Sequence, residues 1–186
     1  MTVPLVVILA LLFGGGSGGH KSPSSSSPVA LPPLTPSAPP SNAATVAPCT
    51  KVLQTLPERL GSLLPRVVHP EPDSLFVVAW GDPPVILRCG VARPADLKLG
   101  SSVDFILIGG SDGRTGVYFD ITKSDHDEVY TSVDRAVYIS ISVPAKYSSP
   151  PVPQLAQAIA TALPPVCVGA QEPGVTDPSQ LCTHRK

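Results

Sequence analysis

Two segments of the chain carry apolar residues at helical spacing. The first begins at Cys49, and its apolar positions are Val52, Leu53, Leu56 and Leu60. Pro57 ends or kinks this helix, because proline lacks the backbone N–H that a helix interior needs. The second segment covers residues 153–163, with proline at its start and a Pro-Pro pair directly after it that prevents continuation. Each segment predicts an amphipathic helix with one face toward a core.

The apolar residues between these helices follow strand patterns. Short runs rich in β-branched and aromatic residues occupy residues 74–80, 85–88 and 103–108. Residues 117–122 and 137–143 alternate apolar with polar side chains, which is the period of a strand with one buried face. Gly-Asp-Pro-Pro between the first two runs predicts a hairpin turn.

The order helix, strands, helix indicates an α+β fold, because the strands are joined by hairpin-length connections and do not alternate with helices. We expect an antiparallel sheet of about four to six strands that carries both helices on one face. This single domain is predicted to cover residues 49–167, and residues 168–186 are predicted to be a C-terminal tail.

The N-terminus has a different composition. Residues 1–19 contain an uninterrupted apolar run, 3–13, followed by glycine and serine, which resembles the apolar region and small-residue exit of a secretory signal. The run is shorter than the roughly 20 residues that span a bilayer. Because no Lys or Arg precedes it, a longer uncleaved anchor that starts upstream and an apolar start of a cytosolic domain remain alternatives. We expect an extracytoplasmic protein, either secreted or associated with the membrane through this segment.

Residues 20–48 are rich in proline, serine, alanine and threonine and contain no acidic residue. Such a composition buries too little apolar surface to fold, and its prolines favour extended backbone. We therefore expect a disordered linker between the apolar segment and the domain.

Charge excludes one class of partner. The 186-residue chain has 13 Lys and Arg against 14 Asp and Glu, for a net charge of −1. The sequence shows no basic block that would neutralise the phosphates of a nucleic acid. Nucleic acid is therefore not expected as a partner.

The four cysteines include no C-x-x-C pair, which favours disulfides over a zinc site in an oxidising compartment. Several connectivities are open. We favour Cys49 with Cys89, which would join the first helix to the end of the hairpin, and Cys167 with Cys182, which would close a shorter C-terminal loop.

Two motifs suggest chemistry that their surroundings do not support. Residues 109–113 match the G-x-S-x-G of serine hydrolases, but a strand pattern follows where the nucleophile elbow requires a helix. We interpret them as a hairpin turn. The acidic run 125–128 lacks the spacing of a calcium loop and is interpreted as a solvated loop tip. No catalytic residue, metal ligand or cofactor is predicted.

The stretch AWGDPPVILRCG, residues 79–90, holds the candidate ligand or partner site, formed by Trp80, Asp82 and Arg88. Most of its residues have structural interpretations, with Trp80 in the core and Asp82 in the turn. Arg88 has none, because an unpaired charge beside apolar Leu87 is costly. We expect a carboxylate partner, either Asp82 or Asp104.

The strings CTKVLQTLP from Cys49, AWGDPPVILRCGVARP from Ala79, RAVYISISVP from Arg135 and LAQAIATALP from Leu155 together resemble a known family. It is a family of uncharacterised exported or membrane-anchored actinobacterial proteins, defined as a domain of unknown function. The resemblance covers residues 49–164 and implies export. It implies no activity and no catalytic residue.

Two functions are compatible with these features. The first is a non-catalytic extracytoplasmic domain that binds an envelope protein or a cell-wall component. The second is a small envelope hydrolase or ligand-binding enzyme that uses Asp82, Arg88 and His126 beside Trp80. The second requires these side chains to converge in one concave pocket.

Overall fold

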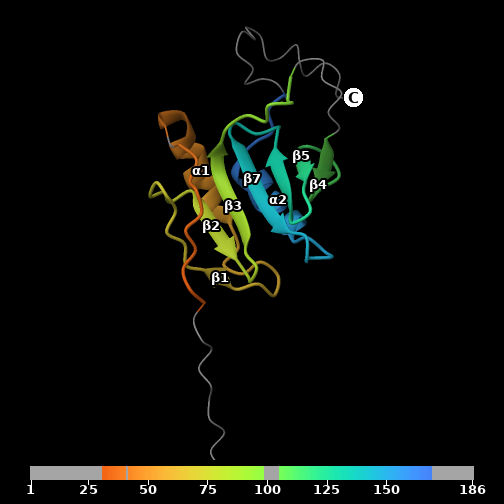
Figure 1. The fold of residues 1–186 in the computed structure, drawn as a ribbon. Helices are drawn as coiled ribbons and strands as arrows, with labels where there is room; N and C mark the ends of the chain where they lie inside the picture. The colour runs from red at the N-terminus through yellow and green to blue at the C-terminus, as the bar shows by residue number, and fades with distance from the viewer. Residues whose placement is uncertain (1–30, 41, 99–104, 169–186) are drawn as a thin grey trace, which may run out of the picture. The chain divides into compact units, whose positions relative to one another are not determined.

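The computed structural model describes residues 31–40, 42–98 and 105–168 (Figure 1). Within these ranges the chain forms, in order, α1 (Ala43–Thr55), β1 (Pro65–Arg66), β2 (Val77–Trp80), β3 (Val85–Val91), β4 (Ile106–Ile108), β5 (Val117–Lys123), β6 (Asp127–Ser132), β7 (Tyr138–Pro144) and α2 (Val152–Ala162). The predicted α+β class is confirmed. The predicted N-terminal segment 1–19 and the tail, apart from residue 168, lie outside the described residues.

The strands form one sheet in the order β1-β2-β3-β7-β6-β5-β4, and every neighbouring pair is antiparallel. The sheet has seven strands, so the prediction of four to six is wrong. Two strands had no apolar pattern to reveal them. Strand β1 has only two residues, and β6 directs a tyrosine and a serine, Tyr130 and Ser132, to its buried positions. Ser132 is satisfied there because its hydroxyl accepts a hydrogen bond of 3.0 Å from the Ile139 amide.

Both helices lie on the same side of the sheet (Figure 1), as predicted. The register places Leu87 opposite Ile141 and Cys89 opposite Ile139, and all four side chains are buried. The helices cover this face with apolar side chains that are also buried, namely Cys49, Val52, Val152, Leu155 and Ile159. The main core therefore lies between the helices and one face of the sheet.

Helix α1 begins at Ala43, which corrects its predicted start at Cys49. The signal for this start is local. The Asn42 side chain accepts hydrogen bonds from the amides of Ala44 and Thr45, and the Thr45 hydroxyl accepts one from the Asn42 amide, which is a capping box. The domain therefore includes residues that composition alone assigned to the linker, and a proline, Pro48, lies inside the helix.

The Cys49–Cys89 disulfide joins α1 to β3, with Cα atoms 5.6 Å apart. This is the pairing that the sequence favoured. Cys167 is also disulfide-bonded, whereas Cys182, its predicted partner, lies outside the described residues. A disulfide fits an extracytoplasmic location, because cytosolic thiols are kept reduced.

We predict that replacing both cysteines, in a Cys49→Ala/Cys89→Ala variant, lowers the free energy of unfolding by about 4 kcal/mol. The physical reason is the sequence separation of 40 residues that the bond spans, which restricts the unfolded chain. Urea denaturation followed by circular dichroism measures the loss. Wild-type protein unfolded in reductant should lose at least as much stability, and a loss below about 1 kcal/mol would contradict the assignment of this bond as a major constraint.

Candidate functional site

The residues of the candidate site fall on opposite faces of the sheet. Trp80 is on the helix-covered face, is 3% exposed, and donates from Nε1 to the Glu58 carbonyl at 3.2 Å. Arg88 is on the other face, because it alternates along β3 with the buried Leu87 and Cys89. The structure therefore does not bring Trp80 and Arg88 together, and Trp80 is a core residue.

Asp82 is not the partner of Arg88. Its exposed carboxylate lies 3.6 Å from Nη1 of Arg66, which also donates to the Gly81 carbonyl at 2.9 Å. Arg66 reaches this position from β1, the edge strand that the sequence pattern did not reveal. The other expected partner, Asp104, lies outside the described residues.

Arg88 instead faces a pocket of about 450 Å³, the Arg88 pocket, on the face of the sheet that α1 and α2 leave open. Its walls combine apolar side chains with polar and charged ones, and the lining residues are Pro83, Pro84, Ile86, Arg88, His126, Asp127, Ser142, Pro144 and Lys146. The turn after β2, the turn before β6 and the end of β7 meet here. His126, which the enzyme hypothesis required, is thus brought to the same pocket as Arg88.

The Arg88 guanidinium is held by neutral acceptors. Its Nε donates to the Ser37 carbonyl at 3.0 Å, and its Nη1 donates to the Ser142 hydroxyl at 3.2 Å. The side chain is partly buried, and the resulting desolvation lowers its pKa. None of its contacts in the described part of the chain is to a carboxylate. Its positive charge therefore has no direct carboxylate contact among the described residues, although Asp127 lines the same pocket.

Lys146 places a second cation at the rim. Its ammonium donates to the Asp82 carbonyl and lies 5.3 Å from the centroid of the Tyr147 ring. The Tyr147 hydroxyl donates to the Pro83 carbonyl at 2.7 Å, and burial raises its pKa. These contacts tie the β2–β3 turn to the segment after β7, which fixes the proline wall of the pocket.

A second pocket of about 370 Å³ lies next to the first, and both are lined by Pro144. Its charged groups satisfy one another: Lys123 Nζ is 2.8 Å from Glu128 Oε1, and the Tyr130 hydroxyl donates to the same carboxylate group. These contacts lower the pKa of Glu128, while burial raises the pKa of Tyr130 to about 12. Neither group is therefore poised to exchange protons near neutral pH, which a general acid or base requires.

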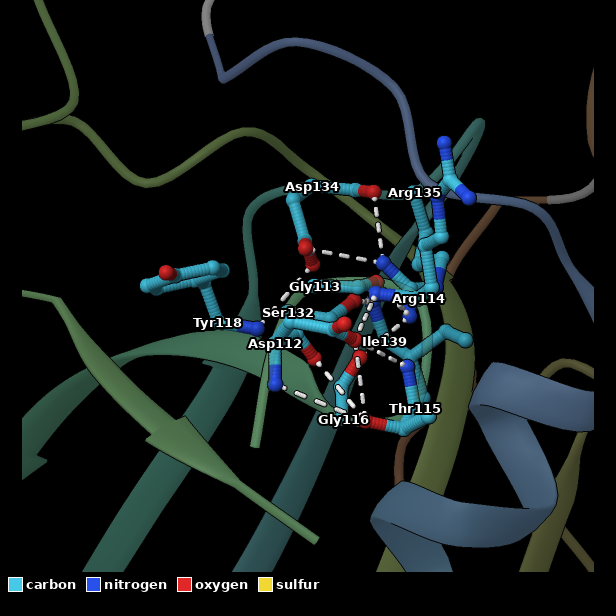
Figure 2. Close-up of polar contacts among 10 residues, drawn as sticks. All are labelled: Asp112, Gly113, Arg114, Thr115, Gly116, Tyr118, Ser132, Asp134, Arg135 and Ile139. Carbon is cyan, nitrogen blue, oxygen red and sulfur yellow. Dashed lines mark hydrogen bonds and ion pairs between the residues drawn. The ribbon is translucent and has the colours of Figure 1, made fainter. Parts of the chain in front are cut away.

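A buried ion pair lies where the loop before β5 meets the β6–β7 turn (Figure 2). Asp134 and Arg135 are both 0% exposed, and Arg135 Nη1 is 2.8 Å from Asp134 Oδ2. Arg135 Nη2 also donates to the carbonyls of Gly113 and Gly116, at 3.1 and 2.6 Å. Adjacent opposite charges between apolar Val133 and Ala136 are a sequence signal that could have revealed this pair.

The loop that Arg135 holds contains the G-x-S-x-G match. Asp112 Oδ1 accepts from the amides of Arg114 and Thr115 and from the Thr115 hydroxyl, each at 2.9 Å, and these contacts lower the Asp112 pKa (Figure 2). Strand β5 follows directly and pairs with β4 as a hairpin. The predicted hairpin turn is confirmed, and the helix that a nucleophile elbow needs is replaced by a strand.

We predict that Arg135→Met lowers the free energy of unfolding by about 3–5 kcal/mol, because it removes the counter-charge of the buried Asp134 carboxylate. Arg114→Met is the matched control, since Arg114 is exposed in the same loop, and it should change stability by less than about 0.5 kcal/mol. Urea denaturation measures both. If Arg135→Met does not fold, the Asp134→Asn/Arg135→Met variant, which removes both charges, should recover folded protein. Equal stabilities of the Arg135 and Arg114 variants would refute the role of the pair.

Comparisons with known proteins support membership of one family. The family model described as "Protein of unknown function (DUF3515)" matches residues 1–167. No curated protein and no solved structure matches the chain. Of the helices within the described ranges, none has the length and apolarity to cross a membrane. The chain therefore belongs to the DUF3515 family of proteins of unknown function.

Proposed function

We propose that this protein is a non-catalytic extracytoplasmic binding domain that holds an anionic group of its ligand in the Arg88 pocket. One observation carries the proposal: a partly buried guanidinium lines a pocket, and its hydrogen-bond partners among the described residues are a carbonyl and a hydroxyl. Burying a charge without a counter-charge is costly. A ligand carboxylate or phosphate would supply that counter-charge.

The other lining groups suit such a ligand. Lys146 adds a second cation, and Ser142 provides a hydroxyl beside the guanidinium. Asp127 provides an acceptor for an N–H or O–H group of the ligand, which would orient it. The prolines and Ile86 form rigid apolar walls, so the ligand is expected to present an apolar part next to its anionic group.

An extracytoplasmic location limits which partners the protein would meet. The Cys49–Cys89 disulfide fits an oxidising environment, and the sequence resembles a secretory signal at residues 1–19. An envelope protein or a cell-wall component with exposed carboxylate or phosphate groups is therefore the partner that we propose. A protein tethered or secreted outside the cytoplasm would meet such groups at high density.

A small envelope hydrolase is the second candidate, because His126 and Asp127 line the same pocket as Arg88. It requires a nucleophile next to a base, and Ser142 Oγ instead accepts a hydrogen bond from Arg88. This reading predicts turnover of an activated ester such as p-nitrophenyl acetate, which His126→Ala would remove. The binding proposal predicts no turnover by either protein.

We predict that wild-type protein binds phosphate or acetate and that Arg88→Gln weakens this binding about tenfold or more. The reason is the loss of a charge-assisted hydrogen bond, which contributes about 1.5–3 kcal/mol. Two-dimensional NMR titration measures the affinity, with acetamide as the uncharged counterpart of acetate. Arg114→Gln, which removes an exposed arginine outside the pocket, should bind like the wild type. If Arg88→Gln and Arg114→Gln bind the anions with equal affinity, or if wild-type protein binds acetamide as tightly as acetate, the proposal is wrong.

A further inference from the structure

Residues 31–38, which we call the strap, cross the open side of the domain before the chain enters α1 (Figure 1). The strap pairs in parallel with the segment after β1, through bridges between Leu34 and Val68 and between Ser37 and Glu71. Its backbone hydrogen bonds join Leu34 N to Val67 O, His69 N to Leu34 O, Glu71 N to Pro36 O and Ala38 N to Glu71 O, at 2.7–3.0 Å. The strap is therefore attached chiefly through its backbone.

Two arginines of the sheet also hold the strap. Arg66 Nη2 donates to the Pro32 carbonyl at 2.8 Å, and Arg88 Nε donates to the Ser37 carbonyl at 3.0 Å. The second contact links the strap to the Arg88 pocket. Because the guanidinium is planar, fixing its Nε fixes the directions of both terminal nitrogens. The Ser37 carbonyl is thus a positioning group for the cation of the pocket.

The attachment of the strap is weak compared with the core. Pro32, Pro33 and Pro36 have no N–H to donate, and among the described residues the strap amides that bond to the domain are those of Leu34 and Ala38. Most of its side chains are exposed, with Pro36 as the buried one. Segments with few buried contacts and exposed hydrogen bonds open locally before the domain unfolds. We therefore expect the strap to open locally before the helices and the sheet unfold.

We infer that docking of the strap regulates the Arg88 pocket, an inference that rests on the function proposed above. With the strap docked, Ser37 directs the guanidinium toward Ser142 and the pocket. With the strap released, Arg88 loses this acceptor and keeps the Ser142 contact alone, so its guanidinium is held less firmly toward the anion. Linkage makes the effect reciprocal: a bound anion stabilises the docked strap.

The test uses the full chain with a Leu34→Pro/Ala38→Pro variant, which removes both strap amides that bond to the domain. The matched control is Thr35→Pro, which adds a proline to the strap at a residue whose amide has no hydrogen bond within the described ranges. We expect the double variant to bind acetate and phosphate at least fivefold more weakly than the control. Its His69 amide should exchange with solvent faster, and its unfolding midpoint in urea should stay close to that of the control.

In wild-type protein, saturating acetate should slow the hydrogen exchange of the Leu34 and Ala38 amides with solvent. The factor should equal the factor by which strap docking raises the affinity of the pocket for acetate. If wild-type protein binds the anions and the double variant binds them as tightly as the control does, regulation by the strap is wrong. The proposed binding function is unaffected by that result. Failure of wild type to bind either anion overturns both, and the wild-type titration alone reveals that case.

Discussion

The alternation of side chains along β3 is the constraint on which the rest of the structure depends. Val85, Leu87 and Cys89 point into the core, and Ile86 and Arg88 point to the open face. The Cys49–Cys89 bond fixes which set faces the helices. A slip of one residue would place Arg88 in the core and Leu87 in solvent, which the disulfide forbids. The covalent bond on one face therefore holds the charge of the pocket in place on the other.

Three arginines on this scaffold show why Arg88 is the unusual one. Arg135 is completely buried, but a carboxylate and three backbone carbonyls compensate its charge. Arg66 lies near the Asp82 carboxylate and donates to two carbonyls. Of these three, Arg88 is the one whose acceptors among the described residues are all neutral. Because burying a charge without a counter-charge is costly, the first two charges have structural explanations, and the third is the charge for which we propose an anionic ligand.

Local patterns made much of the fold predictable. Helix α2, the β2–β3 hairpin and β5 carry strong periodicity, and the Cys49–Cys89 pairing followed from the positions of the first helix and the hairpin. Strand β6 was not predicted because Tyr130 is the one apolar side chain at its two buried positions, the other being Ser132, and one apolar residue makes no alternating pattern. The order of residues 31–40 and 42–48 was not predicted, because a proline-rich composition indicates disorder. Asn42 and Thr45 nevertheless form a capping box, which is a sequence signal for the start of a helix.

Of the candidate site, Arg88 was the residue that the sequence predicted. Arg88 stood out from the sequence because a charge between Leu87 and a half-cystine needs compensation. Its contacts with Ser37 and Ser142 span 51 and 54 residues, and they depend on strand register and on the path of the strap. Spacing along the chain contains no information on such contacts. The same argument explains why Trp80, a neighbour in sequence, belongs to the opposite face.

The N-terminal part of the domain contacts both faces of β3 in succession. Ser37 contacts Arg88 on the open face, and Cys49 binds Cys89 on the helix face. Between these two contacts, Thr45 packs against Gly90, which lies at an irregularity in the β3–β7 pairing and has a φ of +89°. A Cβ atom at Gly90 would lie 3.3 Å from the Thr45 side chain. The disulfide attaches α1 covalently to β3, whereas the strap before α1 is held by hydrogen bonds. A displacement of the strap would therefore separate Ser37 from Arg88, while the disulfide would keep β3, the strand that carries Arg88, in its place.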